Sequence, residues 1–71
     1  MTTLDPCILF GKKLRNIREE GNISQEKLAE LSGLDRTYIS GVERGKRNIS
    51  LRNIFKLANA LHVSVLHLMD M

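Results

Sequence analysis

Apolar residues recur at helical spacing in several stretches of this chain, and short polar stretches separate them. The clearest case is Phe10, Leu14 and Ile17, which have charged residues between them. A period of three to four residues indicates amphipathic α-helices, whereas no stretch shows the strict alternation of a β-strand. The pattern predicts an all-α fold of five short helices.

Residues that favour the ends of helices set the expected boundaries. Asp5 is a good N-cap and precedes Pro6, which is tolerated at the first helical position. Gly21, Gly33 and Gly45 stand where the first three helices should end, because glycine adopts the positive φ of a C-cap without strain. We expect the first helix over residues 6–20, the last over 65–69, and N-caps at Asp5, Ser24, Asp35, Ser50 and Ser64.

The second and third helices have the spacing of a helix-turn-helix unit. Gly33 permits a sharp turn between them that a Cβ would obstruct. Leu28 and Leu31 fall on one face of the second helix, and Ile39 with Val42 forms the buried stripe of the third. In such a unit the second helix lies in the major groove of DNA, which makes residues 35–44 the candidate recognition helix.

Composition restricts the class of protein. A chain of 71 residues, 42% hydrophobic and 27% charged, fits one globular domain, here residues 1–71 with a core over 8–69. The single cysteine, Cys7, cannot form an internal disulfide, and no apolar run approaches the ~20 residues of a membrane span. We therefore expect a cytoplasmic protein without a membrane partner.

Positive charge is concentrated in one part of the chain. Residues 36–56 hold six basic residues against one acid, a net charge of +5, whereas the whole chain has a net charge of +3. A basic segment at and after a recognition helix is the expected footprint of a surface that faces phosphates. The distribution favours double-stranded DNA as the partner over an interaction module that has this fold but no DNA activity.

Residues at fixed offsets match a known family. The matches include Phe10-Gly11, Ser24-Gln25, Leu28-Ala29, Gly33-Leu34 and Glu43-Arg44-Gly45. On these residues the chain resembles the phage repressor and Cro type of helix-turn-helix regulators, the xenobiotic response element (XRE) family. Within that family, residues 34–44 are most similar to the controller proteins of restriction–modification systems.

The resemblance implies a five-helix, lambda-repressor-like domain and a sequence-specific transcriptional regulator. It implies a homodimer on a (pseudo)palindromic operator, control of its own promoter, and RNA polymerase as a further candidate partner. The alternative within the DNA-binding class is the antitoxin of a toxin–antitoxin pair.

The docking geometry and the resemblance together assign the DNA-facing residues. The start of a recognition helix points at base edges, so Arg36, Thr37 and Ser40 are expected to contact bases or phosphates. Gln25 is implied to donate to a phosphate, and the alternative is a solvated side chain. Tyr38 is expected to project outward, either onto DNA or against a neighbour. The full expected set is Gln25, Arg36, Thr37, Tyr38, Ser40, Arg44, Lys46, Arg47 and Asn48.

Two further sets have structural roles. The family pairs the positions of Arg18 and Glu43 as an ion pair that joins the first helix to the end of the third. Other apolar residues exceed what a five-helix core needs, and we expect them to form a dimer interface that sets two recognition helices ~34 Å apart, in preference to enlarging the core. These residues are Leu51, Phe55, Leu66 and Met69.

Gly41 is unusual, because glycine inside a helix costs about 1 kcal/mol relative to alanine. Relatives often carry a large polar side chain at this position. Either the backbone approaches DNA closely here, or base readout is sparse and DNA shape contributes more.

The chain offers no residues for catalysis. No nucleophile–base constellation or phosphate-binding loop is present in the sequence. His62 and His67 are five residues apart and have no companion cysteine or carboxylate cluster, which is too little for a metal site. We expect no enzymatic activity, no metal and no cofactor.

Overall fold

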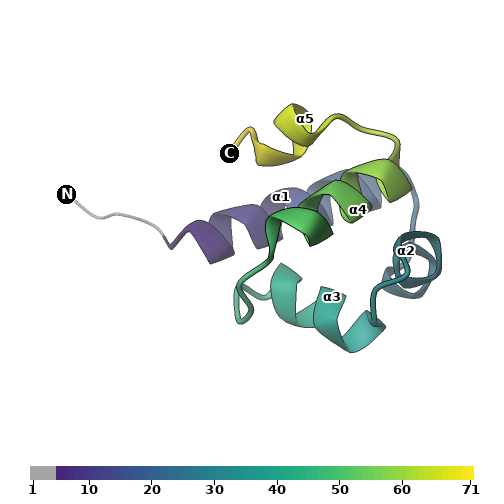
Figure 1. Ribbon diagram of the computed structural model, residues 1–71, viewed down its shortest axis with the longest axis horizontal. Coiled ribbons are helices and arrows are strands. Elements are labelled where there is room, and N and C mark those ends of the chain that lie inside the picture. The colour runs from purple at the N-terminus through teal and green to yellow at the C-terminus, as the bar shows by residue number, and fades with distance from the viewer. Residues whose placement is uncertain (1–4) are drawn as a thin grey trace.

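The computed structural model describes residues 5–71, and these residues form helices and no strand (Figure 1). The all-α prediction is confirmed. The helices in chain order are α1 Pro6–Glu20, α2 Gln25–Ser32, α3 Arg36–Glu43, α4 Leu51–Leu61 and α5 Val65–Met69.

The helices begin at the residues that the sequence indicated. At each N-cap a Ser or Asp side-chain oxygen accepts a backbone N–H two or three residues later, at 2.8 to 3.1 Å. This bond satisfies one of the donors that a helix start leaves unpaired. The end of α1 differs from expectation, because Gly21 has a φ of −87° and the left-handed residue is Asn22, with a φ of 56°.

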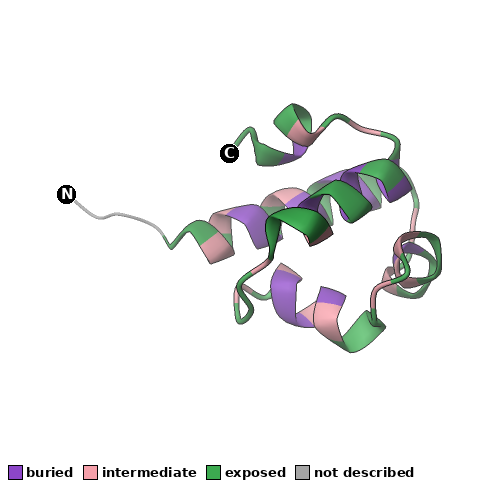
Figure 2. Cartoon of the chain, in the orientation of Figure 1, coloured by how far each residue is buried: buried purple, intermediate pink, exposed green. Residues whose placement is uncertain are grey.

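The helices pack around one core. α1 packs against α3 and α5, α2 packs against α3 and α4, and α5 also contacts α4. In Figure 1, α5 lies on one side of α1 and α4, and α3 lies on the other. Figure 2 shows the buried residues on the inward sides of these helices. The buried hydrophobic residues are Phe10, Leu14, Ile17, Leu28, Ile39, Val42, Ile54, Leu57, Ala58, Ala60, Leu61 and Leu68.

Two leucines correct the expected pattern. Leu31 does not share the buried face of Leu28, since it is 47% exposed and Leu28 is fully buried. The short α2 buries only the part of its surface that meets its neighbours, and Leu31 lies outside that part. Leu68, which the periodicity did not single out, is fully buried where α5 closes onto α1 and α4.

A close helix crossing positions α3. A Cβ added at Gly11 would lie 2.7 Å from the backbone oxygen of Glu43, so α1 meets the C-terminal end of α3 where no side chain fits. Arg18 lies seven residues after Gly11, two turns along the same face of α1. The crossing thereby brings Arg18 to the end of α3.

Candidate nucleic-acid interface

The helix-turn-helix unit consists of α2, a turn at Gly33 and α3. Gly33 has a φ of 75°, a backbone conformation that favours glycine, and it ends α2 two residues before the Asp35 cap of α3. Ile39 and Val42 anchor the inner side of α3 in the core. Because these residues fix the rotation of α3 about its axis, its opposite side must face outward.

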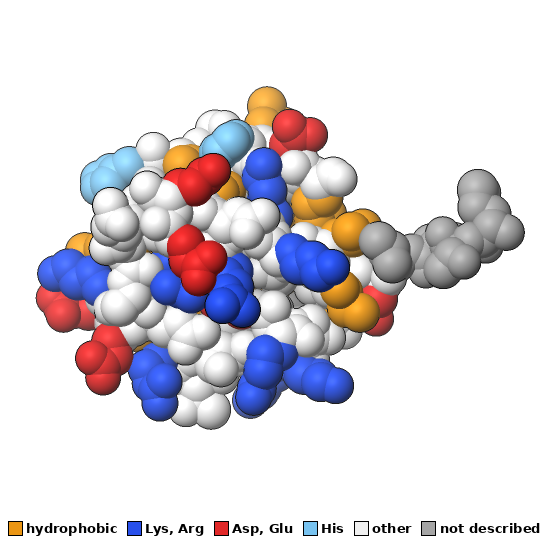
Figure 3. Space-filling model, turned by 180° about the vertical axis from the view of Figure 1, so that it is seen from behind, with side chains coloured by type: hydrophobic (Ala, Val, Ile, Leu, Met, Phe, Trp, Pro, Cys, Tyr) orange, Lys and Arg blue, Asp and Glu red, His pale blue; other side chains and the backbone are white. Residues whose placement is uncertain are grey.

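The outward side of α3 carries polar and basic residues. Arg36 and Thr37 are exposed at its first turn, Ser40 is half-buried one turn later, and Arg44 is exposed at its end. Lys46, Arg47 and Asn48 are exposed in the segment that follows. Seen from behind, Lys and Arg side chains line the lower edge of the molecule, the edge that α3 forms in Figure 1 (Figure 3). This edge offers donors for phosphates and base edges.

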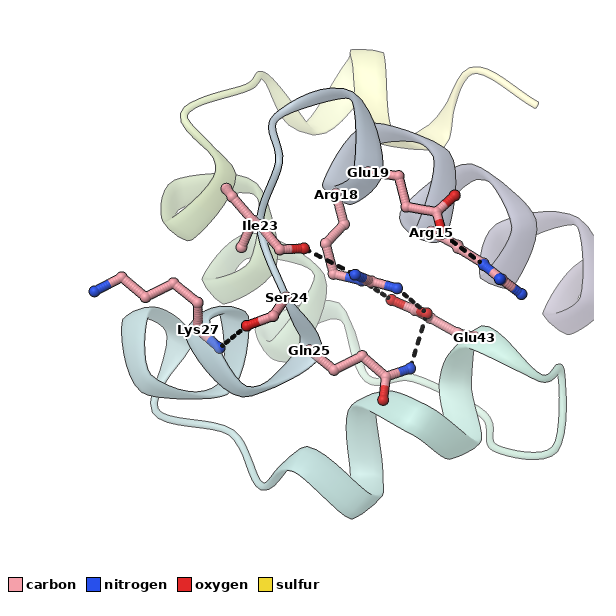
Figure 4. Close-up of polar contacts among 8 residues, drawn as sticks. All are labelled: Arg15, Arg18, Glu19, Ile23, Ser24, Gln25, Lys27 and Glu43. Atoms are coloured by element: carbon pink, nitrogen blue, oxygen red, sulfur yellow. Dashed lines mark hydrogen bonds and ion pairs between the residues drawn. The ribbon is translucent and has the colours of Figure 1, made fainter.

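A buried ion pair holds α3 against α1. The guanidinium of Arg18 donates from Nε to Glu43 Oε2 at 2.7 Å and from Nη2 to Glu43 Oε1 at 3.0 Å. A third bond runs from Nη1 to the backbone oxygen of Ile23, at 2.8 Å (Figure 4). The side chains are only 11% and 3% exposed. The hydrogen bonds to Glu43 raise the pKa of Arg18 and outweigh the opposite effect of burial.

Gln25 belongs to the same network. Its amide Nε2 donates to Glu43 Oε1 at 3.0 Å, and in Figure 4 its amide oxygen points away from Glu43. The sequence suggested either a phosphate contact or a solvated side chain for Gln25, and neither included this hydrogen bond. The side chain is half-buried, and one of its amide N–H groups already donates within the protein. The network thus connects the end of α1, the start of α2 and the end of α3.

Tyr38 does not project freely outward as expected. It is half-buried and packs against the core, and its hydroxyl accepts a hydrogen bond from Nδ2 of Asn53 on α4, at 3.1 Å. The guanidinium carbon of Arg47 lies 5.6 Å from the centre of its ring, within the range of a cation–π contact. In the protein without DNA, Tyr38 therefore packs against its neighbours, which was the alternative to a contact with DNA.

Arg47 also explains Gly41. A Cβ at Gly41 would lie 2.8 Å from Cγ of Arg47, because the arginine stem crosses α3 at that point. Gly41 is buried for the same reason. The sequence suggested either a close approach of the backbone to DNA or sparse base readout at Gly41. Neither explanation involved a side chain from the segment after α3. Arg47 lies six residues after Gly41, beyond the end of α3, so the helical periodicity of α3 gives no sign of this contact.

A family model described as helix-turn-helix matches residues 14–68. Control protein C.BamHI of Bacillus amyloliquefaciens is 55% identical over 64 residues, covering 89% of this chain and 79% of that protein. The crystal structure of the restriction–modification controller protein C.AhdI from Aeromonas hydrophila has 55% identity and a TM-score of 0.86, covering 87% of this chain and 94% of that one.

The chain belongs to the controller proteins of the helix-turn-helix family. This confirms the resemblance and the fold class that the sequence indicated. A further controller protein, C.Esp1396I, was solved as a tetramer in complex with its natural 35 base-pair operator. It is 35% identical, with a TM-score of 0.87 over 97% of this chain and 91% of that one.

This controller-family protein exposes an apolar face on α4 and α5. Leu66 is 84% exposed, and the other residues expected at a dimer interface are 41% to 68% exposed. Leu51, Phe55 and Leu66 are therefore not additional core. Met69 is less exposed and lines a pocket of about 190 Å³ together with Phe10, Ile54 and Met71.

Two other sequence expectations concern membranes and metals. Among residues 5–71, no helix is both long and apolar enough to cross a membrane. In the same part of the chain, no group of three His, Cys, Asp or Glu residues is arranged to hold a metal ion. Both histidines of the sequence are exposed, and His62 ends α4 with a φ of 57°.

Proposed function

We propose that this protein binds a (pseudo)palindromic operator as a homodimer and regulates transcription of its own gene and of an associated restriction–modification system. The observation that carries the proposal is the outward side of α3, which is polar and basic while its inner side is anchored in the core. Arg36, Thr37 and Ser40 are the base or phosphate contacts. Arg44, Lys46, Arg47 and Asn48 bind the phosphates that set the register.

The homodimer rests on the apolar face of α4 and α5. Exposed apolar surface of this extent marks a contact, and a two-fold symmetric pair presents two recognition helices to successive major grooves. Leu51, Phe55, Leu66 and Met69 form this interface in the proposal. C.Esp1396I, the relative solved on its operator as a tetramer, supports assembly on DNA as part of this function.

The relatives favour a controller over an antitoxin, because proteins named as control proteins match most of the chain at 45% identity or more. As an operator-binding regulator, the protein acts in the cytoplasm on the nucleoid. Its effect on RNA polymerase, activation or repression, depends on where the operator lies relative to the promoter.

The test is a titration of the DNA upstream of its own gene at several salt concentrations, against shuffled DNA of the same composition. We expect preferential binding and, for a dimer that touches about eight phosphates, a log–log salt slope near −7. Equal affinity for the two DNAs would refute an operator-binding function. A flat salt dependence would instead favour a protein-interaction module.

A matched pair of variants localises the interface. Lys46→Ala removes a charge next to α3 in each subunit. It should weaken binding on all sequences and reduce the salt slope by about 1 per subunit, or about 2 for the homodimer. Lys27→Ala removes the same charge from α2, where the side chain points away from α3 in Figure 4. The second variant should bind as the wild type does. Equal losses in both variants would contradict the proposed orientation on DNA.

A further inference from the structure

Asn53 is not among the residues expected to bind DNA, but its side chain contacts Tyr38, which is among them. Asn53 lies in the first turn of α4, where its backbone N–H donates to the Ser50 cap at 3.1 Å. Its side-chain Nδ2 donates to the hydroxyl of Tyr38 at 3.1 Å. Asn53 is half-buried, and this hydrogen bond connects the start of α4 to α3.

The contact fixes the chemical role of the tyrosine hydroxyl. An amide nitrogen can only donate a hydrogen bond, so the oxygen of Tyr38 acts as the acceptor toward Asn53. A phenolic hydroxyl has one hydrogen of its own, and that hydrogen must be directed to another partner. Held in this way, Tyr38 offers its surroundings a donor.

Arg47 brings further donors to the ring of Tyr38. Its guanidinium lies over the Tyr38 ring at 5.6 Å, and its stem occupies the space that Gly41 leaves open. A guanidinium has five N–H donors and no acceptor. Tyr38 and Arg47 therefore form a pair of donor groups on one side of α3.

We propose that Asn53 is a positioning residue for operator binding, which keeps the Tyr38 hydroxyl turned as a donor toward DNA beside Arg47. The pair fits neighbouring acceptors, such as O6 and N7 of guanine or two phosphate oxygens. This inference rests on the proposed function. Asn53 itself touches no DNA and acts through Tyr38.

The test is a double-mutant cycle between Asn53→Asp and Tyr38→Phe, read as affinity for the upstream DNA. The aspartate has nearly the same shape but accepts hydrogen bonds, so it draws the hydroxyl hydrogen inward and removes the donor from the DNA side. An acid in the first turn after a serine cap favours the helix, so the variant should fold. Thermal melting of every variant checks this.

Tyr38→Phe alone should weaken binding about fivefold per subunit, the value of one hydrogen bond, and therefore about 25-fold for the homodimer. Asn53→Asp should weaken binding about tenfold per subunit when Tyr38 is present and about twofold per subunit when Phe is at position 38, where only the added charge acts. Asn53→Ala, which removes the amide and adds no acceptor or charge, should cost less than Asn53→Asp and nothing in the Phe background. Costs that are the same in both backgrounds would overturn the proposal.

The same measurements separate the other possibilities. If Tyr38→Phe relaxes discrimination at a single base pair, the acceptor is a base; if it weakens all sequences equally, the acceptor is a phosphate. Either result supports the donor role when the cycle shows coupling. A wild-type protein that does not select the upstream DNA would overturn the proposed function and this inference together. Selective binding with additive costs would overturn this inference alone.

Discussion

Removal of the Arg18 guanidinium should cost far more stability than removal of an exposed one. Arg18→Met keeps most of the apolar stem and deletes the three hydrogen bonds to Glu43 and Ile23. Glu43, whose side chain is only 3% exposed, would lose the guanidinium and retain its hydrogen bond from Gln25. Breaking a buried pair in this way costs about 3–5 kcal/mol.

That cost is large for so small a domain. A chain of this length has a free energy of unfolding of about 4–10 kcal/mol. A loss of 3 kcal/mol corresponds to a fall in Tm of roughly 12 °C or more. Loss of the pair would also free the end of α3 from α1, so operator affinity should fall at temperatures where the variant is still folded.

The chain contains a matched control on the same helix. Arg15 pairs with Glu19 at 3.1 Å, and both side chains are more than half exposed. Arg15→Met should therefore change the free energy of unfolding by no more than about 0.5 kcal/mol. The measurement is urea unfolding of both variants and the wild type, followed by circular dichroism. If Arg18→Met costs no more than Arg15→Met, the ion pair does not hold α3 in place.

The pH dependence follows from the direction of the Arg18 pKa shift. The hydrogen bonds to Glu43 raise this pKa in the folded state. A cation whose pKa is raised contributes its stability fully below the ordinary value and loses it only as the pH rises through the raised one. The stability difference between wild type and Arg18→Met should thus stay constant from about pH 6 to 9. A difference that shrinks steadily over that range would contradict this.

Four further outcomes are expected. Gly11→Ala should lower the free energy of unfolding by about 1–3 kcal/mol in urea, because the added Cβ would meet the backbone at the end of α3. An unchanged free energy of unfolding would refute that close approach. Leu66→Asp should shift the protein toward monomer in sedimentation, and an unchanged profile would remove Leu66 from the dimer interface. Arg36→Ala should lose about 1–3 kcal/mol of discrimination at one base pair, whereas equal weakening on all sequences would make Arg36 a phosphate contact. Burial, followed by the charge of Asp5, raises the pKa of Cys7, whose thiol donates to Asn48 Oδ1 at 3.0 Å. This thiol should therefore react with iodoacetamide at pH 8 more slowly than a free peptide cysteine, and a faster reaction would contradict this.

Local features of the fold could be predicted from the sequence, because their causes are local. Each helix follows a Ser or Asp N-cap whose side chain reaches only two or three residues along the chain. The core stripe of α3, Ile39 and Val42, follows from helical spacing alone. The basic segment after α3 is visible in the charge distribution.

The contacts between side chains of different elements could not be predicted in the same way. Gln25 and Glu43 are 18 residues apart, and Tyr38 and Asn53 are 15 apart. Their hydrogen bonds depend on how the helices cross, which no periodicity of a single segment specifies. The burial of Gly41 under Arg47 is of the same kind. For Leu31, periodicity indicated an apolar position but not whether a neighbouring helix covers it.

The most direct test of the central claim, that α3 and the segment after it face the operator, is chemical-shift mapping by nuclear magnetic resonance with the upstream duplex. The expected result is that backbone amide shifts concentrate at Gln25, in residues 36–40 and in residues 44–48, while the apolar face of α4 and α5, which the proposed dimer covers, stays unchanged. Shifts confined to α4 and α5, or no shifts that distinguish this duplex from a shuffled one, would contradict the claim.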